Sequence, residues 1–196
     1  MHSNAQQVLD FWFLPSDDPG HGQPRAPWFR KDEGFDAEIR ERFGALIDSA
    51  LIGGLDDWLT QPIEPLPALA RILVLDQFTR NAFRDTARAF AGDALALHTA
   101  RAMVASGADR ALSGVQRQFA YLPFEHAEDI SHQRTALQLF QQLAIDEPAR
   151  ADLVTWAQRH LEVVARFGRF PHRNAALGRT STDDERSFLQ IPGSGF

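Results

Sequence analysis

The sequence predicts an all-α protein made of antiparallel helix pairs. Every long segment repeats its apolar residues with the 3.6-residue period of a helix, and no convincing alternation of apolar and polar residues predicts a strand. Helices of similar length follow one another over short connections, which favours antiparallel neighbours packed side by side. At 196 residues the chain suffices for one substantial core, so we expect a single helical domain over residues 1–196.

The N-terminal half predicts four helices and one long loop. The first helix covers residues 4–14 and ends before Pro15. Residues 15–34 contain four prolines and three glycines and therefore predict an irregular loop, which Trp28 and Phe29 anchor to the core. The remaining helices of this half are expected at residues 35–51, from the prolines at 62–67 to about residue 83, and at residues 90–106.

The C-terminal half predicts a short helix at residues 111–121 and two longer ones. Pro123 is expected to open a helix over residues 124–144, since proline is favoured in a first turn. The next helix covers residues 148–167, and residues 168–181 form an arginine-rich segment that is not helical. A Thr182–Glu185 capping box then begins a last short helix, which brings the total to about seven to nine.

Composition narrows the class of protein. The chain has no cysteine, which excludes a disulfide framework and thiolate metal sites, and no apolar run of about 18 residues that would predict a membrane span. The net charge of −6 argues against a broad nucleic-acid-binding face. We expect a cytoplasmic bacterial protein that binds neither membrane nor nucleic acid, while oligomeric state is left open.

Arginines concentrate near the C-terminus. Residues 166–179 read RFGRFPHRNAALGR, with four arginines and one histidine. From Arg159 to Arg179 the charge is +4, so the rest of the chain carries −10. Nineteen of the twenty basic residues are arginines, a bias that GC-rich coding could produce without any function, but their clustering is more informative. Pro171 favours extended backbone, in which the guanidinium groups can bind internal carboxylates, an anionic ligand, or both.

Polar residues also interrupt the apolar helix that starts after the prolines at 62–67. On a helical wheel, the face that carries the apolar residues of its first half continues with polar residues, which are Asp76, Gln77, Arg80 and Asn81. An aspartate on a buried helix needs a partner. One interpretation is an Asp76–Arg80 pair on a face that reaches solvent; the other is that these side chains line the floor of a pocket.

A second polar group falls on the helix expected at residues 124–144. On a helical wheel His126 and Gln133 lie inside the core arc, with Asp129 beside it. A lone core histidine is more often structural than functional. Two polar side chains stacked beside an acid nevertheless favour a lined cavity. His126 and His172 are therefore the candidate acid–base residues.

The same wheel places Glu125, Glu128 and His132 on the far side. With Asp129 they form a stripe that resembles one half of a carboxylate metal site. No other helix supplies a matching stripe, so the sequence predicts a solvated acidic face, with no metal and no cofactor.

These motifs together resemble the bacterial family catalogued as domain of unknown function 924. The resemblance covers about residues 5–190 and lies in VLDFWF, LVLDQFTRNAFR, FAYLPFEHAEDISHQ and RFGRFPHRNAALGR followed by STDDE. It implies paired helices stacked in a tetratricopeptide-like right-handed superhelix and carries over no activity. The motif residues that match are Asp76, Gln77, Arg80, Asn81, His126, Glu128, Gln133, Arg166, Arg169, His172, Arg173 and Asn174.

Three hypotheses of function follow. The first is a binding module for a small anion or a peptide carboxylate in an arginine-rich pocket. The second is a hydrolase or lyase for an anionic substrate, with His126 or His172 as acid–base group. The third is a structural or partner-binding protein in which the motifs are buried ion pairs. The predicted ligand-binding residues are Asp76, Gln77, Arg80, Asn81, His126, Asp129, Gln133, Arg166, Arg169, His172, Arg173 and Asn174.

Overall fold

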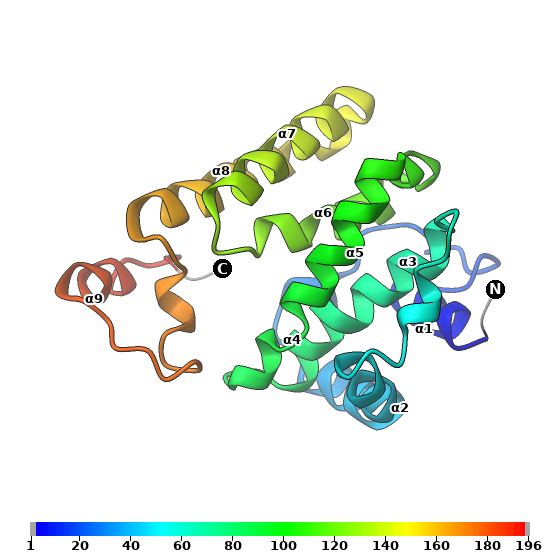
Figure 1. Ribbon diagram of the computed structural model, residues 1–196, viewed down its shortest axis with the longest axis horizontal. Helices are drawn as coiled ribbons and strands as arrows, with labels where there is room; N and C mark the ends of the chain where they lie inside the picture. The colour runs from blue at the N-terminus through cyan, green and yellow to red at the C-terminus, as the bar shows by residue number, and fades with distance from the viewer. Residues whose placement is uncertain (1–2, 195–196) are drawn as a thin grey trace. The chain divides into compact units, whose positions relative to one another are not determined.

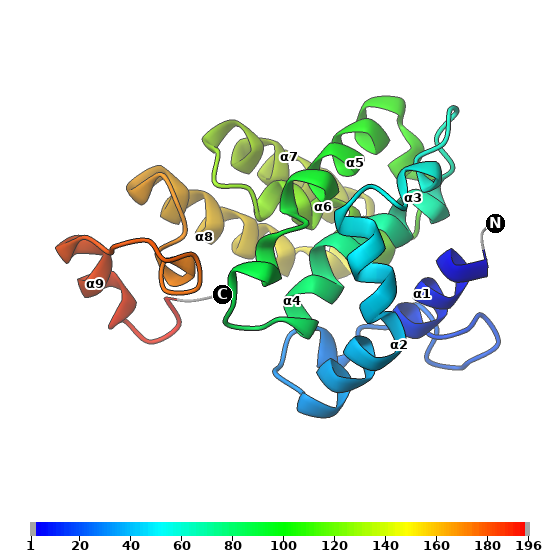
Figure 2. The same ribbon diagram turned by 60° about the horizontal axis from the view of Figure 1, so that its bottom comes forward.

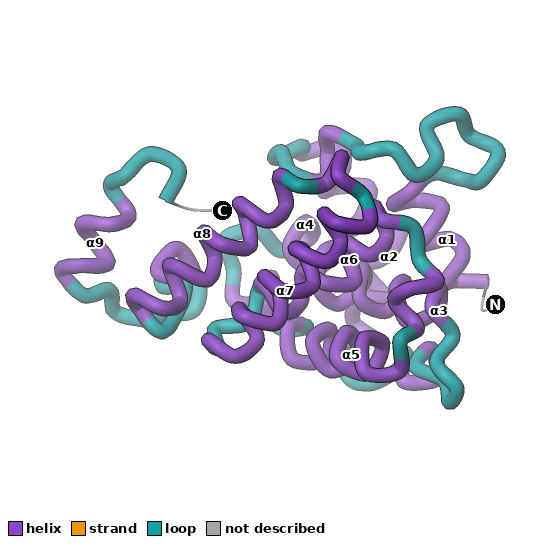
Figure 3. Tube along the Cα trace, turned by 90° about the horizontal axis from the view of Figure 1, so that it is seen from above, coloured by secondary structure: helices purple, strands orange, loops and turns teal. Residues whose placement is uncertain are grey.

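The computed structural model describes residues 3–194, and all regular structure within that range is helical (Figure 3). The all-α prediction is confirmed: when the continuous helix over residues 65–82 is counted once, the described range contains eight α-helices. No helix in this range is long and apolar enough to cross a membrane. The chain divides into two compact units, residues 1–84 with 88–123 and residues 85–87 with 124–196. The tetratricopeptide-like stacking and the single domain stay predictions.

The first unit is built around the helix of residues 65–82, which lies between α5 on one side and α1 and α2 on the other (Figures 1 and 2). Asp32 begins α2 by accepting a hydrogen bond from the backbone N–H of Phe35. Gly107 ends α5 in the left-handed conformation at φ 76°. The helices are α1 (Ser3–Phe13), α2 (Glu33–Leu51), α3 (Pro65–Ile72), α4 (Thr79–Ala82), α5 (Asp93–Ser106) and α6 (Gly114–Glu125), whose last two residues belong to the second unit.

Aromatic side chains fill the core of this unit. Trp12 is fully buried, stacks on Trp28 at 5.8 Å between ring centroids and meets the edge of Phe119 at 5.3 Å. The indole N–H of Trp28 donates to the carbonyl of Trp12, so this residue anchors the loop of residues 15–32 as predicted. Phe29 contributes less to this anchoring: it is 62% exposed, but its ring stacks on that of the fully buried Phe119 at 6.3 Å between centroids.

The helix of residues 65–82 contains a π-helical segment, Leu73–Phe78, between α3 and α4. The hydroxyl of Thr79 donates to the carbonyl of Leu75 just after this segment. A helical wheel at 100° per residue does not apply to a π-helix, whose hydrogen bonds join residues five apart. All six residues of the segment are buried, so the interpretation that Asp76 lies on a face reaching solvent was wrong, whereas the Asp76–Arg80 pair of the same interpretation is confirmed.

Gly92 permits close packing of the start of α5 on the π-helical segment. A Cβ atom at this position would lie 2.1 Å from the carbonyl oxygen of Leu75, and backbone cannot yield as a flexible side chain does. We expect Gly92→Ala to lower the free energy of unfolding by about 1–3 kcal/mol. Gly44→Ala in α2 is the matched control, since a Cβ atom there meets nothing within 4 Å and alanine favours the helix by up to about 1 kcal/mol. Urea unfolding of both variants tests this, and equal stabilities would contradict the close approach.

The second unit pairs α7 and α8 side by side (Figure 1) and adds the short α9. Gly168 ends α8 at φ 69°, and the Thr182–Glu185 capping box begins α9, both as predicted. Residues 168–181 form no α-helix, but Pro171–Arg173 make a 3-10 turn where extended backbone was expected. The bounds are α7 (Ile130–Asp146), α8 (Asp152–Phe167) and α9 (Asp183–Leu189).

The predicted helix over residues 124–144 was wrong in its first turns. Helix α6 continues through Pro123 to Glu125, the chain leaves the helix at residues 126–129, and α7 begins at Ile130. The physical reason is a strong cap, because the carboxylate of Asp129 accepts hydrogen bonds from the backbone N–H groups of Ser131 and His132. The wheel for this segment therefore assigned its residues before Ile130 to faces that do not exist.

Candidate functional site

The structure places the predicted site residues in two groups, one in each unit. The first group lies on the π-helical segment and α4, and the second lies around residues 166–174 and the start of α7. The first contains Asp76, Gln77, Arg80 and Asn81, and the second contains His126, Asp129, Gln133, Arg166, Arg169, His172, Arg173 and Asn174.

In the first group Arg80 binds two carboxylates. Its guanidinium lies 3.0 Å from Asp76 Oδ1 and makes a two-point contact with Asp93, at 2.7 Å and 3.0 Å. Asp76 is fully buried and also accepts a hydrogen bond from the amide of Gln77. Burial lowers the pKa of Arg80, but the two aspartates outweigh burial and leave the pKa raised. Arg80 thus connects the π-helical segment with the start of α5.

Asn81 takes part in a second internal pair. Its amide donates to Asp36 on α2 at 2.8 Å, and Arg84 holds the same carboxylate at 2.5 Å and 2.9 Å. Asp36 is 5% exposed, so these contacts compensate for a buried charge. They tie α2 to the end of α4.

In the second group Gln133 and Asp129 shape the connection between α6 and α7. The fully buried amide of Gln133 donates to the carbonyls of Glu125 and Ala127, at 2.5 Å and 2.7 Å. Asp129 caps α7, and its pKa is lowered first by the hydroxyl of Ser131 and then by the backbone N–H groups it accepts from. Both residues, predicted to bind a ligand, have defined backbone partners in this structure.

Glu128 joins this connection to the arginine-rich segment. It accepts a hydrogen bond from the backbone N–H of Phe170 at 2.7 Å and a two-point contact from Arg179 at 2.6 Å and 2.9 Å. Arg179 also donates to the carbonyl of Phe170. Burial raises the pKa of Glu128, but these partners outweigh it and lower the pKa overall. The backbone N–H and C=O groups of Phe170 are thus both bound, and its side chain is fully buried.

Arg169 and Asn174 bind the last helix. Arg169 makes a two-point contact with Glu185 at 2.6 Å and 2.8 Å, and the amide of Asn174 lies 3.3 Å from the same carboxylate. The bond from Arg169 is the largest cause that lowers the pKa of Glu185 to about 2. Arg166 pairs with Asp184 at 2.7 Å, where both side chains are about half exposed.

Two imidazoles and one guanidinium lie next to Phe170, and a third imidazole, that of His126, lies beside His160. The ring of His160 lies 5.6 Å from Phe170 and 6.4 Å from His126, and the ring of His172 lies 5.6 Å from Phe170. The guanidinium of Arg173 lies over the Phe170 ring at 4.6 Å and is 6% exposed. We call His126, His160, His172 and Arg173 the histidine–arginine cluster.

Within the cluster His160 is electrically neutral. Its Nδ1 lies 2.9 Å from the carbonyl of Trp156 and 3.3 Å from Glu125, and these oxygens fix the proton on Nδ1. Burial lowers the pKa of His160 to about 3, and the other two imidazoles and Arg173 act in the same direction, while the Trp156 carbonyl opposes them only in part. Arg173 and the neighbouring imidazoles thus add to burial in disfavouring a positive charge on His160, which also lies beside the carboxylate of Glu125.

The described residues do not form a metal site. Within residues 3–194 no three histidine, aspartate or glutamate side chains converge in a way that could hold a metal ion. The stripe predicted from Glu125, Glu128, Asp129 and His132 does not exist, because its first three members precede α7.

Several residues of these networks escaped the sequence analysis. Glu128 matched the family motif but was placed on the wrong face, because the wheel assumed a helix there. Glu185 was identified only as a cap. Glu125 was assigned to a solvated face, and Arg179 was counted in the arginine-rich segment but not among the ligand-binding residues. The others gave no pattern that distinguishes them from surface charges; these residues are Asp36, Asp93 and His160.

The comparisons with known proteins agree with the resemblance seen in the motifs. A family model described as "Bacterial protein of unknown function (DUF924)" matches residues 8–193. The structure of ATU0120, a protein of unknown function from Agrobacterium tumefaciens, is similar with a TM-score of 0.80 and 40% sequence identity, over 95% of this chain and 97% of that one. No curated protein matches.

Proposed function

We infer that this chain, which belongs to the bacterial family of unknown function DUF924, is a binding module for a small anionic ligand. The observation that carries the proposal is the histidine–arginine cluster around Phe170. We assign the ligand's carboxylate or phosphate to this cluster.

The charged and N–H groups of the cluster support the proposal that the ligand is an anion. The guanidinium of Arg173 is cationic at any physiological pH, and the imidazoles add N–H donors. Glu125 is the carboxylate in contact with His160. Arg173 also helps to lower the pKa of Glu128. We propose that an anion binds as a further acceptor for the guanidinium and imidazole N–H groups, in addition to these two carboxylates.

The chemistry of the side chains narrows the ligand further. Guanidinium and imidazole N–H groups bind carboxylate and phosphate oxygens through charge-assisted hydrogen bonds. The guanidinium of Arg173 lies over the ring of Phe170 at 4.6 Å and is almost fully buried, which restricts its position before the ligand arrives. We therefore propose dicarboxylates, phosphate esters or a peptide C-terminus as the ligand class.

Thermal unfolding with a panel of anions tests the proposal. We expect a carboxylate or phosphate compound to raise the Tm, since a ligand at 100 times its Kd stabilises by about 2.7 kcal/mol. Arg173→Lys keeps the charge but loses the planar fork, so we expect at least tenfold weaker binding in titration calorimetry. His172→Gln should weaken binding as well.

Arg159→Gln is the control for these variants. This arginine lies on α8, outside the cluster and over the exposed ring of Trp156, so its removal should leave the Kd unchanged. If no anion raises the Tm of the parent, or if the Arg173 and His172 variants bind as the parent does, the proposal fails.

A structural role is the second candidate, favoured by the carboxylate contacts of the other arginines. Arg80, Arg84, Arg169 and Arg179 each hold an internal carboxylate at two points. In this role the motifs stabilise the helices, and a partner protein binds elsewhere. One result distinguishes the two candidates. If the role is structural, Arg173→Lys lowers the Tm and no anion binds the parent.

A further inference from the structure

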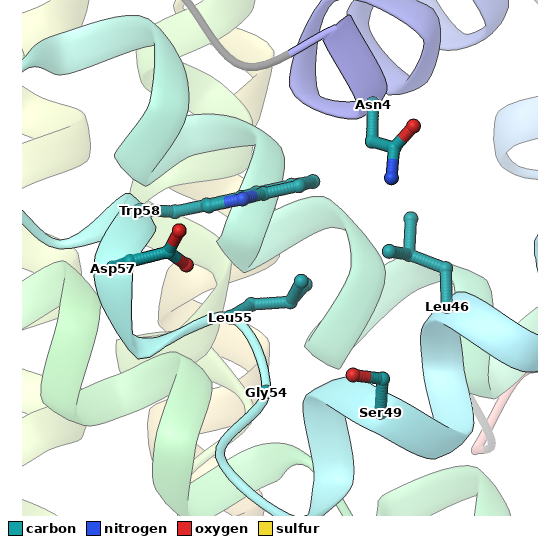
Figure 4. Close-up of a pocket in the computed structure, with 7 residues that line it drawn as sticks. All are labelled: Asn4, Leu46, Ser49, Gly54, Leu55, Asp57 and Trp58. Carbon is teal, nitrogen blue, oxygen red and sulfur yellow. The ribbon is translucent and has the colours of Figure 1, made fainter.

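Two hollows lie in the first unit, away from the histidine–arginine cluster. The hollow in Figure 4 has a volume of about 290 Å³, and Asn4, Ser49 and Asp57 provide its polar groups beside the ring of Trp58. Its described lining contains no cation. The other, which we call the α1–α2 hollow, has a volume of about 320 Å³ and is lined by Asp10, Phe11, Leu14, Pro15, Arg25, Phe35, Glu38 and Arg42.

The α1–α2 hollow offers aromatic surface. Phe11 and Phe35 stack with their ring centroids 5.0 Å apart and their planes 13° apart. Each is 8% exposed, and Arg42 lies over the Phe11 ring at 4.9 Å and Arg25 over the Phe35 ring at 5.7 Å. The apolar side chains of Leu14 and Pro15 in the lining are less buried. An aromatic or aliphatic group can pack against this surface.

Three of the four charged side chains in the lining pair with another polar or charged side chain. Glu38 and Arg42 form an ion pair at 2.6 Å. Asp10 accepts a hydrogen bond from the amide of Gln6 at 2.6 Å. Arg25 is the fourth.

Arg25 binds the C-terminal end of α1 through one nitrogen of its guanidinium group. Its Nη1 donates to the carbonyls of Phe11 and Trp12, at 2.6 Å and 2.9 Å, which fixes the orientation of the group. Its Nε and Nη2 meet no hydrogen-bond acceptor, and no carboxylate forms an ion pair with it, among residues 3–194. Burial lowers the pKa of Arg25, and the more distant Asp18 and Glu38 offset this only in part.

The same edge of other arginines in this protein binds carboxylates. Arg84 holds Asp36 through Nε and Nη2, at 2.5 Å and 2.9 Å. Arg169 holds Glu185 through the same two nitrogens, at 2.6 Å and 2.8 Å. The corresponding edge of Arg25 has the geometry to hold the carboxylate of a ligand.

We propose that the α1–α2 hollow binds a small carboxylate with one aromatic or apolar group, its carboxylate on the Nε–Nη2 edge of Arg25 and its apolar group against Phe11 and Phe35. A volume of about 320 Å³ lies at the small end of ligand pockets, which fits a single ring with a short acidic arm. This site shares no residue with the histidine–arginine cluster and does not depend on the proposed function.

Titration followed by NMR tests the proposal with three matched compounds. Phenylacetate should bind at least tenfold more tightly than phenylacetamide, which has the same shape without the charge. Acetate, which lacks the ring, should bind more weakly than phenylacetate. Phenylacetate should shift the Nε–H signal of Arg25 and the amide signal of Phe35. Equal binding of phenylacetate and its amide would overturn the proposal.

Two variants locate the site. Arg25→Lys keeps the positive charge and should weaken phenylacetate binding at least tenfold, because lysine cannot make the two-point contact. Arg30→Lys, at an exposed arginine of the same loop, should leave the affinity within twofold. If Arg25→Lys fails to fold, the comparison of phenylacetate with phenylacetamide on the parent still decides. Loss of phenylacetate binding in His172→Gln would place the ligand in the cluster and overturn the proposal.

Discussion

Arg80→Met is expected to lower the free energy of unfolding by about 3–5 kcal/mol, since it takes a cation from a fully buried carboxylate. Methionine keeps much of the apolar stem, so the loss reports the charge and not a large cavity. Asp76 then has to stay ionised with one partner fewer or take up a proton. Urea unfolding at neutral pH, followed by circular dichroism, measures the change.

Arg42→Met is the matched control for this prediction. Arg42 and Glu38 are also an ion pair four residues apart, but each side chain is 48% exposed. Such a pair contributes about 0–1 kcal/mol. The double variant Arg80→Met with Asp76→Asn should recover part of the loss, because it also removes the buried charge. A loss in Arg80→Met as small as in Arg42→Met would show that Asp76 does not depend on Arg80.

Acid should destabilise the protein through His160 before its carboxylates titrate. The pKa of His160 is about 3 in the folded chain and about 6.5 when unfolded, so below pH 6.5 the unfolded state binds the extra proton. Stability is therefore lost as the pH falls from 6.5 toward 3, by about 1.4 kcal/mol per pH unit. Between pH 6.5 and 4.5 we expect a loss of about 2 kcal/mol, because the slope reaches its full value only well below pH 6.5; urea unfolding at each pH measures it.

His160→Gln should flatten this pH dependence, because glutamine takes up no proton in this range. His98→Gln, at an exposed histidine on α5, should leave the slope unchanged. Below pH 4.5 Glu185 destabilises the protein as well, because its lowered pKa means that the unfolded chain takes up a proton there before the folded chain does. The comparison is therefore confined to the higher pH range. The same slope in the parent and in His160→Gln would contradict a neutral, buried imidazole.

The helix pattern could be predicted from the sequence to a large extent. Gly107 and Gly168 end their helices in the left-handed conformation, and Thr182 caps the last one, because these signals depend on neighbouring residues alone. The pattern failed where a tertiary contact or a stronger cap changed the backbone. At Asp129 the cap prevailed over the continuous apolar period, and at Leu73–Phe78 the helix widened into a π-helical segment.

By itself the sequence determined the all-helical class, the family and the segment in which the arginines cluster, since each is a local property of the chain. The tertiary structure alone decided which carboxylate each arginine binds. Arg179 and Glu128 are 51 residues apart and Asn81 and Asp36 are 45 apart, and no periodicity encodes such a pair. A buried guanidinium takes whatever acceptor the packed helices bring within hydrogen-bond distance, so its partner follows from the fold.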